Sequence, residues 1–204
     1  MMNKVYNSSN LKKHTTTNPL KKYMIKYFNN KLINIINSIN TPKSTILDAG
    51  CGEGFISNLL ATHIKDAKIY AIDSNQDAIN YACKHQSPEI YFSVGNIYNI
   101  DAQNDSFNIV CSTEVLEHIH HPEDALKELL RVAQNYVLIS VPQEPYFCLG
   151  NLLSGKNILR LGNPIDHIHC YTFNGIKKFI KKIFPDKKIT LFNCIVWTII
   201  LIEK

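Results

Sequence analysis

Short apolar segments that alternate with helix-like segments constrain the fold more than any other feature of this sequence. Apolar segments of strand length lie at residues 45–48, 68–72, 90–94, 107–112 and 136–141. Apolar residues recur at helical spacing between most of them, at residues 55–63, 76–85 and 122–132. Such alternation requires crossover connections, which keep strands parallel and cover both faces of the sheet with helices. The sequence therefore predicts an α/β fold with a doubly wound, mostly parallel sheet.

Both ends of the chain depart from this alternation. Residues 1–17 are polar, and we expect a flexible N-terminal segment, followed by a helix over residues 18–39 with one apolar face. The last two apolar segments, "KITLF" and "IVWTIILI", are separated by only two residues, which favours a hairpin although a long connection stays open. With 204 residues, 45% of them hydrophobic, the chain suffices for one sizeable core. We expect a single domain over residues 18–204.

The cysteines and the apolar runs bear on the compartment. The six cysteines show no CxxC spacing and give no disulfide framework, so we expect reduced thiols in a cytoplasmic protein. The first residues hold no apolar signal core, and the longest apolar run, residues 194–202, is too short to span a bilayer. We therefore expect no membrane insertion.

Positive charge gathers in two lysine-rich regions. No Asp or Glu precedes Asp48, whereas lysines are frequent there and again between Lys177 and Lys188. Arg131 and Arg160 are the only arginines, the side chain that grips phosphate with two parallel hydrogen bonds. We interpret these regions mainly as solvated surface, so nucleic acid is not the expected partner, although an anionic partner stays open.

Three glycines at alternate positions follow the first apolar segment, in "ILDAGCGEGFISNLL". Nicotinamide-binding turns space their glycines as GxGxxG and seat a pyrophosphate on the next helix, but Gly50, Gly52 and Gly54 follow GxGxG. Asp48 and Glu53 would repel a pyrophosphate and would suit a cationic ligand. A ligand with a sulfonium, an α-amino group and a ribose, S-adenosylmethionine, fits these features.

The second strand ends in "YAIDSNQDAI", where Asp73 lies at the carboxyl edge of the sheet. A carboxylate accepts two hydrogen bonds at once and so suits the two ribose hydroxyls. The alternative role of Asp73, a cap for the following helix, could equally be filled by Ser74 or Asn75.

These motifs resemble those of the class I S-adenosylmethionine-dependent methyltransferases. "ILDAGCGEG", "IYAIDSNQDAI", "FSVGNIYNI" and "FNIVCSTEVLEHI" are similar to four successive motifs of that family, the last to its small-molecule branch. The resemblance implies a seven-stranded sheet whose last strand is antiparallel. It also implies cofactor contacts, with the glycines at the methionine moiety, Asp73 at the ribose, and Asn96 with Ile97 near the adenine, where the family usually has Asp in place of Asn96. The expected cofactor-binding residues are Asp48, Gly50, Cys51, Gly52, Gly54, Asp73, Ser74, Asn96, Ile97 and Glu114.

Methyl transfer needs alignment and, for a hydroxyl acceptor, a base. "TEVLEHIHHPED" follows the fourth strand and places Glu114, Glu117 and His118 at i, i+3 and i+4, one face of a helical turn. His118 is the first candidate base, with a structural role beside the cofactor as the alternative. We expect residues 142–172 to form a lid over the acceptor, and this segment supplies two further candidates, His167 and His169.

The acceptor is left open by these patterns. The segment from "VPQEP" to "GNPIDHIHCYT" resembles a bacterial subgroup associated with glycan or lipid-linked saccharide pathways, so we expect a small-molecule or saccharide-like acceptor. Small-RNA 2′-O-methyltransferases are similar in carrying ExxEH and a later histidine that bind Mg²⁺, here Glu114, Glu117 and His118 with His167 or His169. Because Mg²⁺ prefers oxygen ligands, we expect no metal, and the RNA enzyme is the alternative. A non-catalytic S-adenosylmethionine-binding scaffold is a further alternative.

Overall fold

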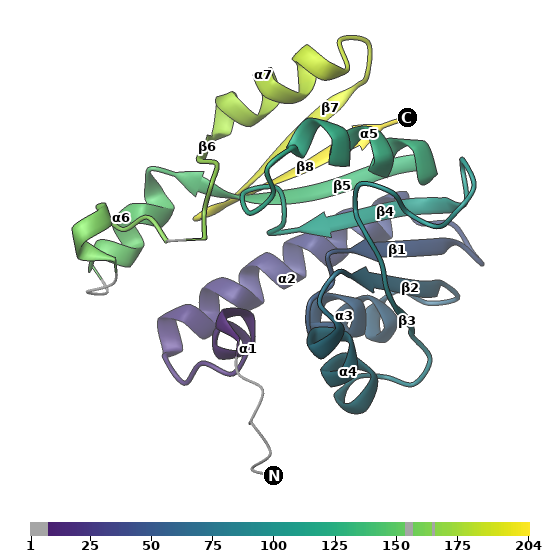
Figure 1. The fold of residues 1–204 in the computed structure, drawn as a ribbon, viewed down its shortest axis with the longest axis horizontal. Coiled ribbons are helices and arrows are strands. Elements are labelled where there is room, and N and C mark those ends of the chain that lie inside the picture. The colour runs from purple at the N-terminus through teal and green to yellow at the C-terminus, as the bar shows by residue number, and fades with distance from the viewer. Residues whose placement is uncertain (1–7, 154–156, 165) are drawn as a thin grey trace. The chain divides into compact units, whose positions relative to one another are not determined.

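The structure of the chain is a computed structural model that describes residues 8–153, 157–164 and 166–204. The chain divides into two compact units, Met1–Asp101 and Ala102–Lys204, each of which is described by itself (Figure 1). Residues 1–7, part of the segment predicted to be flexible, lie outside the described residues.

Two helices open the first unit. Ser8 caps α1 (Ser9–His14), so part of the segment expected to be flexible forms a helix. Asn18 caps α2 (Pro19–Ile39), and Pro19 in its first turn has the backbone φ that a helix start requires. The buried side of α2 includes Phe28, Leu32 and Ile36, and α2 packs against the helix that follows the glycine turn. The helix predicted over residues 18–39 is confirmed.

Three parallel strands form the sheet of the first unit. They are β1 (Thr45–Ala49), β2 (Lys68–Asp73) and β3 (Tyr91–Val94), with β2 in the middle. The crossover helices α3 (Phe55–His63) and α4 (Gln76–His85) both pack against β2. The carboxyl ends of β1 and β2 lie side by side, with Asp48 paired to Ala71 and Ala49 paired to Ile72. The glycine turn and Asp73 therefore meet at one edge of this sheet.

Four strands form the main sheet of the second unit. The strand β4 (Phe107–Thr113) pairs in parallel with β5 (Ala133–Glu144). On the other side of β5, β8 (Trp197–Glu203) pairs antiparallel, and β7 (Ile189–Cys194) pairs antiparallel with β8. The predicted hairpin of the last two strands is thus confirmed. The sheet carries much of the core of this unit, because eight of the twelve residues of β5 and six of the seven residues of β8 are buried.

Helices and one short strand complete the second unit. The helix α5 (Pro122–Val132) packs on β4 and β5, and α7 (Phe173–Ile183) packs on β7 (Figure 1). Between β5 and α7 lie α6 (Tyr146–Leu153), a 3-10 turn at Ile158–Arg160 and the strand β6 (Tyr171–Thr172), which pairs in parallel with the end of β5. None of these three short elements is predicted from the sequence.

Within each unit the predicted α/β architecture holds. Strands are mostly parallel and the last strand is antiparallel, as expected. The strands number eight among the described residues, one more than predicted, because β6 adds a strand within the expected lid. In the part of the chain that the structure describes, every helix is too short or too polar to cross a bilayer.

Candidate active site

The glycine turn is built around backbone conformations that favour glycine. Gly50, Gly52 and Gly54 have φ angles of 81°, 52° and 76°, in the left-handed region. A Cβ on Gly54 would lie 2.7 Å from Cζ of Phe92, and one on Gly52 would lie 3.1 Å from Nδ2 of Asn10. The torsions therefore favour glycine at all three positions, and the close approach of Phe92 adds to this at Gly54.

Asp48 lies under the turn as a buried carboxyl. Its Oδ2 accepts a hydrogen bond of 2.6 Å from the Ser57 hydroxyl, while Oδ1 is buried and, among the described residues, has no hydrogen-bond partner. Burial raises the pKa of Asp48 to about 6, and the charge of Asp73 adds to the rise, against the opposing effect of the Ser57 hydrogen bond. A buried acceptor without a donor is costly, so Oδ1 is suited to a cationic or hydrogen-bonding group of a ligand.

Asp73 at the end of β2 ties the turn to the sheet. Its Oδ2 accepts from the Gly52 backbone N–H at 2.8 Å, and its Oδ1 accepts from the Asn75 N–H at 2.8 Å. Asn75, and not Asp73, caps α4. Each carboxylate oxygen has a second lone pair, so both can still accept from ribose hydroxyls.

The helix α1 covers part of the turn through Glu53. The Ser8 hydroxyl donates to Oε1 of Glu53, and Asn10 Nδ2 donates to Oε2 at 2.5 Å. His14 stacks on Phe55, with ring centroids 4.3 Å apart, and its burial lowers its pKa to about 4. Glu53 therefore binds the N-terminal segment, a role different from that of Asp48.

The remaining cofactor candidates of the first unit differ in exposure. Cys51 is buried, which raises its thiol pKa well above the usual value. Ser74 and Asn96 are exposed and Ile97 is half-buried. Asn96 uses its side-chain oxygen to accept from the Tyr98 N–H at 2.9 Å. In the described structure this carbonyl oxygen thus stabilises its own turn.

In the second unit, Glu114 takes an unusual backbone conformation directly after β4. Its φ is 59°, and its N–H donates to Ser140 O at 3.1 Å. Its Oε2 accepts from Trp197 Nε1 at 2.7 Å, and its Oε1 lies 3.5 Å from the Ser140 hydroxyl. A left-handed non-glycine residue at the end of a parallel strand is a frequent mark of a functional position. The predicted helical turn is wrong here, because the segment after Glu114 forms turns and not a helix.

Glu117 and His118 follow in this turn and are linked to the expected lid. The Glu117 carbonyl accepts from the backbone N–H groups of Ile168 and His169, at 2.8 and 3.1 Å. His118 Nδ1 lies 2.9 Å from Asp166 O, and because a carbonyl only accepts, Nδ1 carries the proton. His118 Nε2 lies 3.9 Å from Oε1 of Glu117, whose side chain is 1% exposed, and in the neutral imidazole Nε2 is the nitrogen that bears the lone pair.

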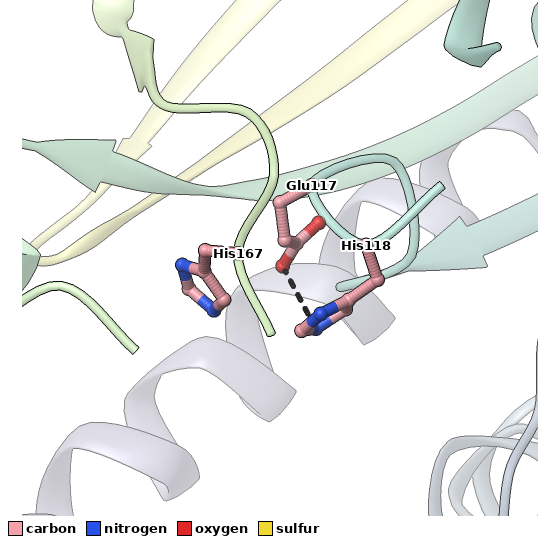
Figure 2. Close-up of side chains that lie close together, drawn as sticks. All are labelled: Glu117, His118 and His167. Atoms are coloured by element: carbon pink, nitrogen blue, oxygen red, sulfur yellow. Dashed lines mark ion pairs between the residues drawn. The ribbon is translucent and has the colours of Figure 1, made fainter. Parts of the chain in front are cut away.

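His167 joins this group, whereas His169 does not. The His167 ring contacts the His118 ring edge-on, with ring centroids 4.9 Å apart, and stacks on the Phe147 ring, with centroids 5.4 Å apart. Burial lowers the His167 pKa, and the nearby His118 lowers it further. The His169 ring faces Tyr171, with ring centroids 6.1 Å apart. Figure 2 shows Glu117, His118 and His167 turned toward one another from two separate segments of the chain.

Comparison with known protein families shows the family of this chain. A family model described as "Methyltransferase domain" matches residues 40–146, more than half of the chain. The chain belongs to this methyltransferase family. The matched segment runs from the end of α2, through the glycine turn and Asp73, to the end of β5.

Individual relatives agree with this assignment. A curated protein of Invertebrate iridescent virus 6, named as a candidate methyltransferase 235L, is 38% identical over 53 residues, which cover 26% of this methyltransferase and 20% of the viral protein. A methyltransferase structure from Aquifex aeolicus is 15% identical, covers 97% of this chain and 99% of its own, and has a TM-score of 0.69.

Two further solved structures have the same fold. Magnesium protoporphyrin IX methyltransferase from Synechocystis PCC 6803, with bound S-adenosylhomocysteine, is 16% identical, with 92% and 88% of the two chains covered and a TM-score of 0.69. The methyltransferase domain of bacterial CtHen1 is also 16% identical, with 89% and 100% covered and a TM-score of 0.69.

Family membership confirms the predicted enzyme class and cofactor, S-adenosylmethionine. The residues of this methyltransferase also fit the cofactor chemically, because Asp48 Oδ1 is a buried acceptor that has no hydrogen-bond partner among the described residues. The roles assigned to individual residues stay predictions, including those of Asn96, Ile97 and Glu114.

Several partners of the site residues have no signal in the sequence. Ser57 on Asp48 and Trp197 on Glu114 lie 9 and 83 residues away along the chain. Ser8 and Asn10, in the segment expected to be flexible, bind Glu53 from 45 and 43 residues away. Pairings of this kind depend on tertiary packing, so no spacing rule could have found them.

Proposed function

We propose that this protein transfers the methyl group of S-adenosylmethionine to an oxygen or nitrogen nucleophile of a small-molecule or saccharide-like acceptor. When bound, the cofactor supplies an electrophilic methyl group on a sulfonium. In the proposal, residues of the first unit hold the cofactor, and Glu117, His118 and His167 of the second unit handle the acceptor. Two separate sets of side chains support these two roles: Asp48 and Asp73 at the glycine turn, and the group of Glu117, His118 and His167.

On the cofactor side, we assign Asp48 and the glycine turn to the amino-acid end and Asp73 to the ribose. Among the described residues, no donor bonds to the buried acceptor Asp48 Oδ1, and an α-ammonium group would supply one. Asp73 is fixed by two backbone N–H groups at 2.8 Å, so its carboxylate is oriented before any ligand arrives. The cofactor thus needs little reorganisation of these residues.

On the acceptor side, the geometry of His118 carries the proposal. The Asp166 carbonyl holds the proton on Nδ1 and leaves the Nε2 lone pair beside the buried Glu117 carboxylate. An imidazole in this state can accept a proton directly from an acceptor hydroxyl or from a protonated amine. His167 lies in edge contact with His118 and adds a second imidazole. His169, whose ring faces Tyr171, is less well placed for this role.

The test is a methyl-transfer screen with methyl-labelled S-adenosylmethionine against sugars, nucleotide sugars, phenols and amines. We expect at least one acceptor to gain label, and His118→Gln to reduce kcat/KM by roughly 10²- to 10⁴-fold while cofactor affinity is unchanged. His120→Gln is the matched control, because His120 is exposed and lies two residues away. A folded protein that binds the cofactor and labels no acceptor would favour the scaffold alternative.

An RNA 2′-hydroxyl is a second candidate acceptor, favoured by one observation. Glu117, His118 and His167 come together as three of the four side chains that the resemblance to small-RNA methyltransferases implies. Against it, Glu114 is turned to Trp197 and Ser140. A short RNA with a free 3′-terminal ribose belongs in the same screen, beside its 2′-deoxy analogue. Label on the RNA but not on the analogue would establish this candidate.

A further inference from the structure

We propose that Glu117, His118 and His167 form a binding site for one divalent transition-metal ion of the borderline class that zinc represents. The site departs from the expectation that the protein uses no metal, and its existence does not depend on the proposed function. The use that we assign to the ion does rest on that function.

The three side chains offer one ligand atom each within a small volume. These atoms all lie within 4.8 Å of one another, and His118 Nε2 is 3.9 Å from Glu117 Oε1 (Figure 2). Ligand atoms around a tetrahedral zinc ion lie about 3.3 Å apart, given metal–ligand bonds of about 2.0 to 2.1 Å. Side-chain rotations that shorten these separations by at most about 1.5 Å would therefore bring the three atoms to bonding distance from one ion.

The donor set selects the class of metal. Two imidazole nitrogens and one carboxylate are the ligands of catalytic zinc sites, which keep a fourth position open. Magnesium requires mainly oxygen ligands in octahedral geometry. Glu114, which a magnesium site of the RNA-enzyme type would need, is instead held at 2.7 Å by the Trp197 indole N–H. The structure thus offers three ligands of mixed type and not an oxygen-rich cage.

The surroundings orient two of the ligands as metal sites require. The Asp166 carbonyl, 2.9 Å from His118 Nδ1, fixes the tautomer that points the Nε2 lone pair at the site. Such outer hydrogen bonds are general companions of metal-bound histidine. Phe147 stacks on the His167 ring and limits its rotation. These contacts set the rings in place before an ion binds.

Backbone hydrogen bonds hold the two contributing segments together. Ile168 and His169 donate their N–H groups to the Glu117 carbonyl, so the segment with His167 is attached to the turn with Glu117 and His118. The Glu117 carboxylate, 1% exposed, lies where a divalent cation would offset the cost of burying its charge. The site is therefore formed by the fold and not by flexible surface groups.

A cation at this position would polarise an acceptor hydroxyl taken up at the open fourth position and lower its pKa, so that the proton passes to solvent. His118 is then a metal ligand, and its Nε2 does not act as the base. Such activation serves methyl transfer to oxygen more than transfer to nitrogen, because a neutral amine already carries the lone pair that attacks the methyl group, whereas a neutral hydroxyl is a weak nucleophile. If the proposed function holds, the site therefore favours a hydroxyl acceptor.

The test measures metal binding to the whole chain without cofactor or acceptor. Protein stripped with chelator is titrated with zinc by calorimetry, and its metal content is then measured by mass spectrometry. We expect one zinc per chain. Loss of a residue that only hydrogen-bonds to a metal ligand lowers metal affinity roughly 10- to 100-fold, and we expect His118→Gln and His167→Gln to lower zinc affinity by more than that. His120→Gln should bind as the wild type does.

Cobalt provides a readout that requires no variant. Co²⁺ bound to two imidazoles and a carboxylate in a four-coordinate site gives strong visible d–d bands, whereas an octahedral or absent site gives weak ones. Strong bands that zinc displaces support the proposal. Weak bands, zinc below one equivalent, unchanged affinity in both ligand variants, or binding of magnesium in preference to zinc would each overturn it.

Parallel calorimetry with S-adenosylmethionine separates this proposal from the proposed function. A chain that binds the cofactor but no zinc overturns the metal site and leaves the methyltransferase proposal intact. A chain that binds one zinc but no cofactor supports the metal site and overturns the methyltransferase proposal.

Discussion

At the scale of single residues, Asp48 shows how burial prepares a site for a cation. Its carboxyl is 1% exposed, accepts one hydrogen bond from Ser57, and has a pKa raised to about 6 by desolvation. A group in this state is costly when charged and alone, but it binds a cationic ligand group without further loss of hydration. The cofactor proposal thus gives a reason for an otherwise unfavourable carboxyl.

The raised pKa of Asp48 predicts a pH dependence of stability. The folded chain holds this proton more tightly than the unfolded chain, whose carboxyl has a pKa of 3.8, so the stabilising contribution is full below that pH and lost as the pH rises through about 6. In urea titrations without cofactor, the free energy of unfolding of Asp48→Asn should therefore rise relative to that of the wild type between about pH 4 and pH 7, by up to roughly 3 kcal/mol.

The control for this prediction is Asp77→Asn, a substitution at an exposed carboxyl in the first turn of α4. Its free energy of unfolding should follow the wild-type pH profile with at most a constant offset. If the free energy of unfolding of Asp48→Asn also ran parallel to that of the wild type over this pH range, the carboxyl of Asp48 would be charged throughout. The raised pKa assigned to Asp48 would then be wrong.

Most site residues could be predicted from the sequence, because short motifs carry them. The glycine turn and Asp73 belong to local patterns whose geometry follows from a strand, a tight turn and a helix. Glu117 and His118 are neighbours in one turn, but the helical face expected to align them with Glu114 does not form. The backbone of Glu114 turns left-handed instead, a conformation that a spacing rule does not indicate for a glutamate.

At the scale of elements, β8 contributes more than core residues. Its first residue, Trp197, is 5% exposed and donates its indole N–H to Glu114 at 2.7 Å. The last strand thereby holds the carboxylate that follows β4. This hydrogen bond ties β8 to the start of the turn that leads to Glu117 and His118.

Removing the indole N–H should therefore destabilise this turn. Trp197→Phe keeps an aromatic ring but leaves the Glu114 carboxylate without that donor, and we expect a loss of about 1.5 to 3 kcal/mol in the free energy of unfolding. Ser140→Ala, which removes the longer 3.5 Å contact to the same carboxylate, should cost less. Urea denaturation checks both, and equal losses would contradict the assigned role of Trp197.

The elements divide clearly into predictable and unpredictable ones. The helices α3, α4 and α5 have the bounds that apolar periodicity indicates, because each buries one face against a sheet. The elements α1, α6 and β6 escape prediction, being six, eight and two residues long. Helices and strands this short depend on tertiary contacts more than on their own sequence.

At the scale of the whole molecule, family membership and the fold rest on independent observations. The family model matches residues 40–146, and the structural likeness to the Aquifex aeolicus methyltransferase extends over 97% of the chain. The alternation of strands and helices predicts this fold class because crossovers between parallel strands have one handedness. The acceptor cannot be predicted in the same way, since the segment between β5 and α7, which we expect to contact it, shows no regular period in the sequence.

The central claim is that this chain binds S-adenosylmethionine through the glycine turn and Asp73. Calorimetry of the purified protein with S-adenosylmethionine tests it most directly, with NAD as the competing ligand and Asp73→Asn and Asp77→Asn as paired variants. We predict micromolar binding, about −8 kcal/mol, that is weakened at least about tenfold in Asp73→Asn, unchanged in Asp77→Asn, and absent for NAD. Folded protein that binds NAD, or that binds S-adenosylmethionine equally well with Asp73→Asn, would contradict the account.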